Sequence, residues 1–169
     1  MKKLLDLFKN ENIEQKVANV LFEKNLTIST AESCTGGLVS SKLTDISGSS
    51  AFVKSNFVTY ANEAKHEILG VSNEILEKYG AVSEQCAFAM AEGLMNKTHC
   101  DIALCTTGIA GPTGAEKGKP VGTMFVAAKN KYATEIKRIQ LSPKYSRKKM
   151  KEVFSQKALE FVLEFINKN

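Results

Sequence analysis

LTISTAESCTGGLVSSKL, residues 26–43, contains two kinds of pattern separated by a glycine-rich turn. Residues 26–30 alternate in polarity and are rich in β-branched side chains, which predicts a strand. Residues 31–37 are mostly small and end in Gly36 and Gly37, and residues 38–43 have the composition of a helix. The stretch therefore predicts a strand, a tight turn and a helix N-terminus in direct succession.

The rest of the chain continues this mixture of helical and extended patterns. Further helices are predicted over residues 13–24, 62–69, 72–79, 83–97 and 146–166, and further strands over residues 52–60, 101–107, 121–128 and 132–141. The last two strands form a predicted hairpin around residues 129–131. This order predicts the α/β class, with a mixed β-sheet between helices and a single domain over residues 1–169.

Length and composition agree with one globular unit. The 169 residues suffice for one domain, and 43% hydrophobic residues with only 3 Pro exclude a disordered or collagen-like chain. The sequence contains no run of about 18 apolar residues, so it predicts no membrane-spanning helix. Residues 1–9 are basic like a signal peptide, but Asp6 and Lys9 interrupt the apolar part, so we predict no export signal.

Cysteine spacing and charge indicate the cellular compartment, the absence of a metal site and the kinds of partner to expect. The four Cys residues form no CxxC pair and lie at no zinc-binding spacing, which predicts reduced thiols in a cytoplasmic protein and no metal site. The net charge of +5 comes largely from lysines, many of them in residues 144–151. We interpret that segment as a solvated helix face, and predict neither a nucleic-acid nor a membrane partner.

Ser33 is the first candidate for chemistry, because it lies between a predicted strand and a predicted helix N-terminus, where free N–H groups favour negative charge. An N-capping serine explains the same position, and the sequence lacks the GxSxG nucleophile motif. The neighbouring Cys34 is a rival nucleophile, since a thiol at a helix N-terminus can have a lowered pKa.

A serine nucleophile needs a base, and the chain has only His66 and His99 besides lysines. Lys65 and His66 are adjacent on a predicted helix, so their side chains point about 100° apart and do not serve one site. Tyr60, Asn62 and Lys65 form a polar cluster where a strand ends and a helix begins. A lysine acts as a base only if burial or positive charge lowers its pKa, and an exposed lysine is the alternative.

Three further segments are candidates for holding an anion. GIAGPTG, residues 108–114, is neither a dinucleotide fingerprint nor a P-loop, but its N–H groups can stabilise an oxyanion if it is more than a structural turn. Residues 48–50, which include Ser49, and the pair Arg147 and Lys151 can each bind phosphate or simply be solvated. The helix start at residues 35–37 is the preferred phosphate site.

Together, six motifs in this order resemble the CinA C-terminal domain family over about residues 12–166. They are TAESCTGG (30–37), GSS (48–50), YANEAK with LGV (60–65 and 69–71), GAVS (80–83), GIAGPTG (108–114) and KPVGT (119–123). The resemblance implies a three-layer α/β/α sandwich, a commonly oligomeric cytoplasmic protein and no metal or other cofactor. It also implies a stand-alone nicotinamide-nucleotide amidohydrolase, which converts nicotinamide mononucleotide to nicotinate mononucleotide and ammonia.

Carried over by position, the family's catalytic serine, lysine and tyrosine fall on Ser33, Lys65 and Tyr60. Ahead of the last helix the family often has an acidic residue followed by Arg, whereas this chain has Tyr145-Ser146-Arg147. Arg147 is expected to keep the role of that Arg, and Lys151 to replace a second one. The substrate is expected to contact Thr35, Gly36, Gly37, Ser49, Asn62, Gly108, Ala110, Gly111 and Arg147.

Two other classes of function remain open from the sequence. The same domain can bind a pyridine nucleotide as a regulatory module without turnover, because fold and family do not guarantee an active site. A hydrolase or redox sensor that depends on Cys34 is the third possibility, and it predicts sensitivity to alkylation that survives in Ser33→Ala. A small-molecule nucleotide and further copies of the chain are the expected partners.

Overall fold

The computed structural model of the chain describes residues 11–169. The predicted absence of an export signal concerns residues 1–9, which lie outside the described residues. No helix within residues 11–169 is long and apolar enough to cross a membrane.

A five-stranded mixed sheet runs through the described part of the chain, in the order β2-β1-β3-β4-β5. Its strands are β1 (Ile28–Glu32), β2 (Val53–Val58), β3 (Ile102–Gly108), β4 (Thr123–Lys129) and β5 (Thr134–Gln140). Strand β1 pairs in parallel with both β2 and β3, while β4 pairs antiparallel with β3 and with β5. The predicted mixed sheet with an antiparallel hairpin is confirmed.

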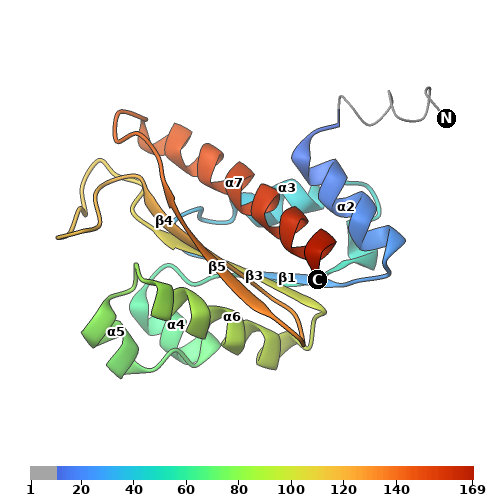
Figure 1. Cartoon of the computed structure of the whole chain (residues 1–169), viewed down its shortest axis with the longest axis horizontal. Helices are drawn as coiled ribbons and strands as arrows, with labels where there is room; N and C mark the ends of the chain where they lie inside the picture. The colour runs from blue at the N-terminus through green and yellow to red at the C-terminus, as the bar shows by residue number, and fades with distance from the viewer. Residues whose placement is uncertain (1–10) are drawn as a thin grey trace.

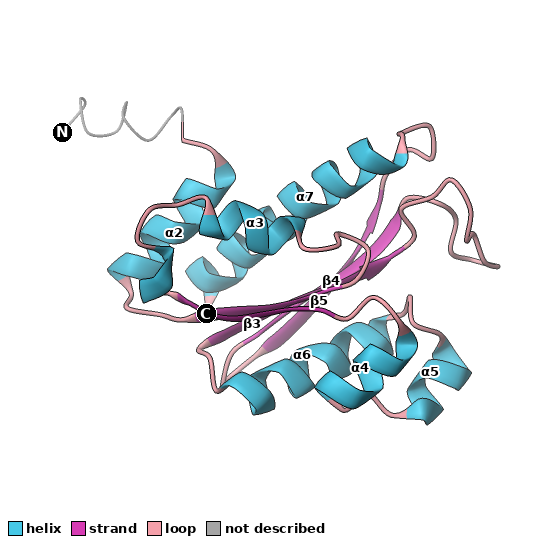
Figure 2. Cartoon of the chain, turned by 180° about the vertical axis from the view of Figure 1, so that it is seen from behind, coloured by secondary structure: helices cyan, strands magenta, loops and turns pink. Residues whose placement is uncertain are grey.

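Helices cover both faces of this sheet, so the predicted three-layer α/β/α sandwich is confirmed (Figures 1 and 2). One layer contains α2 (Ile13–Glu23), α3 (Leu38–Thr44) and α7 (Arg147–Lys168), and the other contains α4 (Asn62–Leu69), α5 (Asn73–Tyr79) and α6 (Glu84–Thr98). A short 3-10 helix, Ser49–Ala51, leads into β2. Side chains of Ser72 and Ser83 cap α5 and α6, as the sequence predicted.

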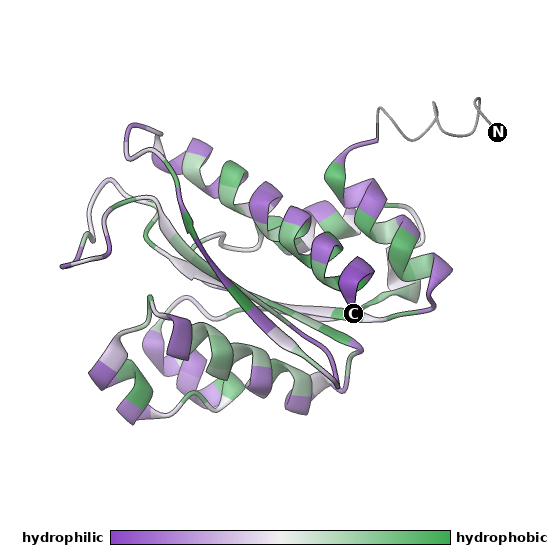
Figure 3. Cartoon of the chain, in the orientation of Figure 1, coloured by the Kyte–Doolittle hydropathy of each residue, from purple (hydrophilic) through white to green (hydrophobic). Residues whose placement is uncertain are grey.

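Two hydrophobic clusters hold the layers together, one on each face of the sheet. Most helices alternate between hydrophobic and hydrophilic residues along their length, as amphipathic helices do (Figure 3). All five residues of β1 are buried, because β1 lies inside the sheet with helices on both sides. Its buried position explains why alternation located this strand two residues too early, over residues 26–30.

Helix α4 is held close to α6 by a glycine. A Cβ added at Gly93 of α6 would lie 1.7 Å from the carbonyl oxygen of Leu69, the last residue of α4. Only a residue without a side chain permits this approach. The contact fixes the position of α4, which carries Lys65.

Candidate active site

The carboxyl ends of the three parallel strands meet at one edge of the sheet, and a pocket of about 330 Å³ opens there. Ser33 directly follows β1, Tyr60 lies two residues after β2, and Gly108 ends β3. The pocket is lined by Ser33, Cys34, Tyr60, Lys65, Ala81, Val82, Thr107, Gly108, Ile109, Ala110, Gly111, Thr113, Gly114, Glu116 and Arg147. The structure thus brings together the three predicted catalytic residues and four of the nine predicted substrate-binding residues.

Lys65 contacts Ser33 at the bottom of this pocket. Its Nζ lies 3.2 Å from Ser33 Oγ, and it also donates to the carbonyl oxygens of Thr59 at 2.8 Å and of Tyr60 at 3.2 Å. The lysine is only 1% exposed, although its helix lies at the surface. The serine hydroxyl and the lysine amine therefore form a buried pair within proton-transfer distance.

Burial lowers the pKa of Lys65, because a charged ammonium loses its hydration there. The smaller opposing effects come from charges on Cys86, Cys34 and Glu63. Burial raises the pKa of Cys86 to about 11 and that of Cys34 to about 12, so both thiols are neutral at pH 7. Neither thiol then favours the protonated lysine, and the neutral amine required of a base becomes accessible.

Cys34 lines the pocket but is a poor rival to Ser33. Burial raises the pKa of its thiol to about 12, and the carboxylate of Glu32 adds to the rise. Only the thiolate is strongly nucleophilic. The environment of Cys34 therefore favours its interpretation as a packed thiol that lines one wall.

Neither histidine lies at the pocket. His66 lines a separate hollow between α4 and α5, and its Nδ1 lies 2.8 Å from the carbonyl oxygen of Val71. His99 caps the C-terminal end of α6, where it lines a different cavity near the opposite edge of the sheet. The expected separation of the Lys65 and His66 side chains is confirmed.

Tyr60, the predicted catalytic tyrosine, lies in the pocket, but its phenol and its main chain have different partners. The group that accepts from Lys65 is its main-chain carbonyl, while its phenol oxygen accepts from Arg147 Nη2 at 2.6 Å. Arg147 Nη1 also donates to the carbonyl oxygen of Gly111 at 2.7 Å. Arg147 thus bridges Tyr60 and the glycine-rich loop at the exposed side of the pocket.

The helix start chosen as the phosphate site is already filled by an anion of the protein itself. The carboxylate of Glu32 accepts hydrogen bonds from the main-chain N–H groups of Gly37, Val39 and Ser40. It also accepts from the Thr35 hydroxyl at 2.6 Å, and Thr35 is fully buried. The structure therefore places Thr35, Gly36 and Gly37 in the support of α3 and outside the pocket lining, which corrects that expectation.

Two other expected contacts also fall elsewhere. Ser49 begins the 3-10 helix before β2, and Asn62 lies at the exposed start of α4, where it borders a separate hollow with His66. Lys151 is absent from the pocket lining, and its Nζ lies near Gly36, 3.0 Å from the position of an added Cβ. Helix spacing placed Lys151 beside Arg147, and the two do line a separate hollow together, but only Arg147 lines the pocket that contains Ser33.

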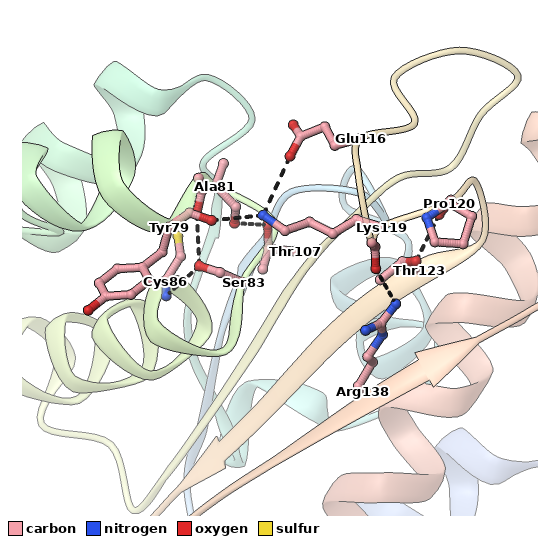
Figure 4. A network of polar contacts seen from close by, with 12 residues as sticks. Tyr79, Ala81, Ser83, Cys86, Thr107, Glu116, Lys119, Pro120, Thr123 and Arg138 are labelled. Carbon is pink, nitrogen blue, oxygen red and sulfur yellow. Dashed lines mark hydrogen bonds and ion pairs between the residues drawn. The ribbon is translucent and has the colours of Figure 1, made fainter.

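Part of the pocket wall was missing from the predicted set: Ala81, Val82, Thr107 and Glu116. Figure 4 shows how this wall is held, with the Thr107 hydroxyl donating to the carbonyl oxygen of Ala81 at 2.7 Å. Lys119 pairs with Glu116 at 3.4 Å and donates to the carbonyl oxygen of Tyr79 at 2.8 Å. The GAVS and KPVGT motifs were the available signals, since these contacts join the segments that contain them.

Main-chain donors for a developing oxyanion are present near Ser33. Among the described residues, none accepts a hydrogen bond from the N–H of Cys34, Ala110 or Gly111. Cys34 is the residue that follows the serine, which is the position that supplies such a donor in α/β-hydrolases. Ala110 and Gly111 belong to the glycine-rich loop, which lines the same pocket.

Fold and site together define a three-layer α/β/α protein with a buried serine–lysine pair at the carboxyl edge of its parallel strands. Residues 10–166 match the model of the CinA C-terminal domain. The chain belongs to the CinA C-terminal domain family.

Two curated relatives illustrate the match. A putative competence-damage inducible protein of Acetivibrio thermocellus is 42% identical over 168 residues, which cover 99% of this chain and 40% of that protein. A CinA-like protein of Syntrophus aciditrophicus is 55% identical over 118 residues, 70% of this chain and 28% of that protein. The matched regions therefore span less than half of either relative.

Solved structures with the same fold cover almost the whole chain. Competence/damage inducible protein CihA from Agrobacterium tumefaciens has a TM-score of 0.86 and 38% identity, covering 93% of this chain and 96% of that one. A CinA superfamily protein from Klebsiella pneumoniae has a TM-score of 0.88 and 30% identity, covering 94% and 100%. These domains therefore share both the sheet and its helical layers with this chain.

Proposed function

We propose that the protein is a serine amidohydrolase in which Ser33 is the nucleophile and Lys65 the base. The observation that carries the proposal is the contact of 3.2 Å between Ser33 Oγ and the buried Nζ of Lys65, whose pKa is lowered. A neutral amine can accept the serine proton, whereas an exposed lysine would remain charged at pH 7. Both histidines lie away from this pair.

In the proposed reaction, Lys65 takes the proton from Ser33 as Oγ attacks the carbon of a carboxamide. The resulting oxyanion accepts from the N–H of Cys34 or from those of Ala110 and Gly111, each worth about 3 kcal/mol of transition-state stabilisation. Lys65 returns its proton to the leaving nitrogen, so ammonia departs and an acyl-serine ester remains. Water then attacks the ester while Lys65 takes its proton, the bond between the acyl carbon and Ser33 Oγ breaks, and Lys65 returns the proton to Oγ as the acid leaves and ionises to the carboxylate.

The proposed substrate is nicotinamide mononucleotide, which becomes nicotinate mononucleotide. Resemblance to the family supports this substrate, and Arg147 supports it chemically, because a guanidinium has five donors and only two are engaged here. We assign Arg147 to the nucleotide phosphate, and assign Tyr60 to holding Arg147 through its phenol oxygen. Cytoplasmic location and a homo-oligomer remain part of the proposal.

In the decisive experiment, the purified protein is incubated with nicotinamide mononucleotide, its riboside or free nicotinamide. The products are identified by mass spectrometry, and the ammonia released is measured. We expect deamidation of the mononucleotide, no turnover by Ser33→Ala, and nucleotide binding by that variant within about tenfold of the wild type. Binding without ammonia release would instead indicate a regulatory module. More than a few per cent of wild-type turnover in Ser33→Ala would reject the nucleophile.

A further inference from the structure

Glu32 is a buried acid with an unusually complete set of hydrogen bonds. It ends β1, immediately before Ser33, and is 1% exposed. Its Oε1 accepts from the N–H of Ser40 at 2.7 Å and the hydroxyl of Ser40 at 2.5 Å. Its Oε2 accepts from Thr35 Oγ1 at 2.6 Å and from the N–H groups of Gly37 at 3.0 Å and Val39 at 3.1 Å.

All five donors lie within residues 35–40, so the carboxylate closes the turn that begins at Ser33. A buried carboxylate is strongly unfavourable without such partners, whereas charge-assisted bonds to main-chain N–H groups are strong and directional. Three other hydrogen bonds also restrain the turn: Ser33 N–H donates to the carbonyl oxygen of Thr106 at 3.0 Å, Gly36 N–H donates to that of Ser33 at 3.1 Å, and the hydroxyls of Thr35 and Thr106 lie 2.8 Å apart. The Glu32 carboxylate is nevertheless the single group that joins residues 35, 37, 39 and 40, so it ties the segment after the nucleophile to the start of α3.

The main chain of Glu32 also reaches the other half of the catalytic pair. Its carbonyl oxygen accepts from the N–H of Thr59 at 2.8 Å, and the carbonyl oxygen of Thr59 accepts from Lys65 Nζ at 2.8 Å. The nucleophile thus follows Glu32 directly in the chain, and the residue that anchors the base is one hydrogen bond away from Glu32. A shift of Glu32 would change the distance between Ser33 Oγ and Lys65 Nζ.

We infer that Glu32 is a positioning residue: its carboxylate holds the Ser33 turn so that the hydroxyl stays within reach of Lys65. The inference deepens the proposed function and rests on its assignment of Ser33 as the nucleophile. It needs no particular substrate, because it concerns the reactivity of the serine itself.

The test is Glu32→Gln, which keeps size and shape but replaces one carboxylate oxygen with an NH₂ group. Whichever oxygen is replaced, an amide donor then faces at least one main-chain N–H group, so part of the turn loses its acceptor. The rate at which an alkyl fluorophosphonate modifies Ser33 is measured by intact-protein mass spectrometry, with Ser33→Ala as the blank. We expect that rate to fall at least about 30-fold, because a small misplacement of a nucleophile is costly.

Asn12→Ala is the matched control, because Asn12 caps α2 through a bond from the N–H of Gln15 at 3.0 Å, and it does not line the pocket. Both variants are expected to lower the melting temperature, but only Glu32→Gln should slow Ser33 labelling in fully folded protein. Nucleotide binding should stay within about threefold in both, since Arg147 is untouched. Labelling of Glu32→Gln at the wild-type rate would overturn the inference.

If Glu32→Gln fails to fold, Ser40→Ala provides the measurement, since it removes the hydroxyl that donates to Glu32 at 2.5 Å and contacts Thr30 Oγ1 at 2.8 Å, and it keeps the main-chain N–H. A loss of about three- to tenfold in labelling is then expected, and an unchanged rate would overturn the inference. Dependence of labelling on Glu32 without deamidation of the mononucleotide would reject the proposed substrate while supporting the positioning role. No labelling of the wild type would reject both.

Discussion

Lys65 combines two properties that seldom occur in one lysine: it is 1% exposed and it donates to two carbonyl oxygens as well as to a serine. Carbonyl oxygens accept from an ammonium or a neutral amine, so they hold Nζ in place in either state. Burial favours the neutral state. The pH at which the amine is neutral is therefore set by the fold around this residue.

Turnover should rise with pH through the lowered pKa of Lys65, with no contribution from either histidine to the rising limb. Lys65→Arg should be nearly inactive although it keeps the charge, because a guanidinium stays protonated to about pH 12 and is not a base. Lys65→Ala should have an equally low kcat, because it has no amine to act as the base. The measurement is kcat and KM for these variants across pH.

His66→Ala is the control for this series and should change kcat and KM little. The His66 ring is hydrogen-bonded to the carbonyl oxygen of Val71 and does not line the pocket. A lysine that only neutralised a phosphate would give a different result, with Lys65→Arg active and the main loss in KM. An active Lys65→Arg together with an inactive His66→Ala would contradict the mechanism.

The lowered pKa also predicts how stability depends on pH. Between the lowered pKa and about 10.4, the unfolded chain keeps a proton on Lys65 that the native protein has lost, so the free energy of unfolding rises with pH in that window. Below the window both states are protonated and this contribution is flat. Lys65→Met should lack the rise, by up to about 1.4 kcal/mol per pH unit. Urea denaturation of both proteins at several pH values measures the difference.

At the scale of elements, the glycine-rich loop is fixed by a close contact. Gly111 has φ of 72°, and a Cβ there would lie 2.5 Å from Val121 Cγ1. Gly111→Ala should lower the free energy of unfolding by about 2–4 kcal/mol and reduce kcat at least about tenfold, because the loop that lines the pocket with Ser33 must shift to relieve the clash with Val121. Chemical denaturation and steady-state kinetics check both effects.

Gly118→Ala is the matched control, since Gly118 has φ of 78° but no atom within 4 Å of an added Cβ. It should cost only about 1–2 kcal/mol for the left-handed backbone and leave kcat unchanged. Equal effects of the two substitutions on kcat would show that the contact with Val121 does not set the loop position.

The elements themselves were largely predictable from sequence, whereas several roles within them were not. Capping serines and apolar periodicity located the helices, because these signals act over a few neighbouring residues. Helix N-termini attract anions, which led to residues 35–37 as a phosphate site. The anion that occupies this helix start comes from Glu32 in the preceding strand, and no local pattern indicates that a strand glutamate turns toward the next helix.

Some residues of the candidate site were predictable from the sequence, and the contacts between distant residues were not. Family motifs predicted Ser33 and Lys65, and the structure brings them together. The interaction of the Tyr60 phenol with Arg147 joins residues 87 positions apart, so spacing along the chain carried no signal for it. Spacing likewise carried no signal for the hydrogen bond between Thr107 and Ala81, which are 26 positions apart in the chain.

At the scale of the whole molecule, the pocket lies where the strand order reverses. After β1 the chain passes through α3 to β2 on one side, and after β2 it crosses through α4, α5 and α6 to β3 on the other side (Figures 1 and 2). Connections that leave in opposite directions open a crevice at the carboxyl ends of the strands. Segments that carry the nucleophile, the base and the glycine-rich loop all border that crevice.

The reaction proposed for this crevice needs no metal ion. Within residues 11–169, no group of three or more His, Cys, Asp or Glu side chains could hold one. Because Ser33 and Lys65 supply the nucleophile and the base in the proposed reaction, exhaustive dialysis against a chelator should leave kcat unchanged, as measured by ammonia release. Lost activity that one added metal restores would contradict the mechanism.

Burial of Lys65 has a further consequence for the life of the polypeptide. In an unfolded or newly synthesised chain this lysine is surrounded by water, its pKa is about 10.4, and it carries a proton at pH 7. It cannot then accept a proton from Ser33, which behaves like any other serine. In the mechanism proposed, Ser33 is therefore unreactive during synthesis and after denaturation. Only molecules in which the sheet and α4 are assembled are able to cleave an amide.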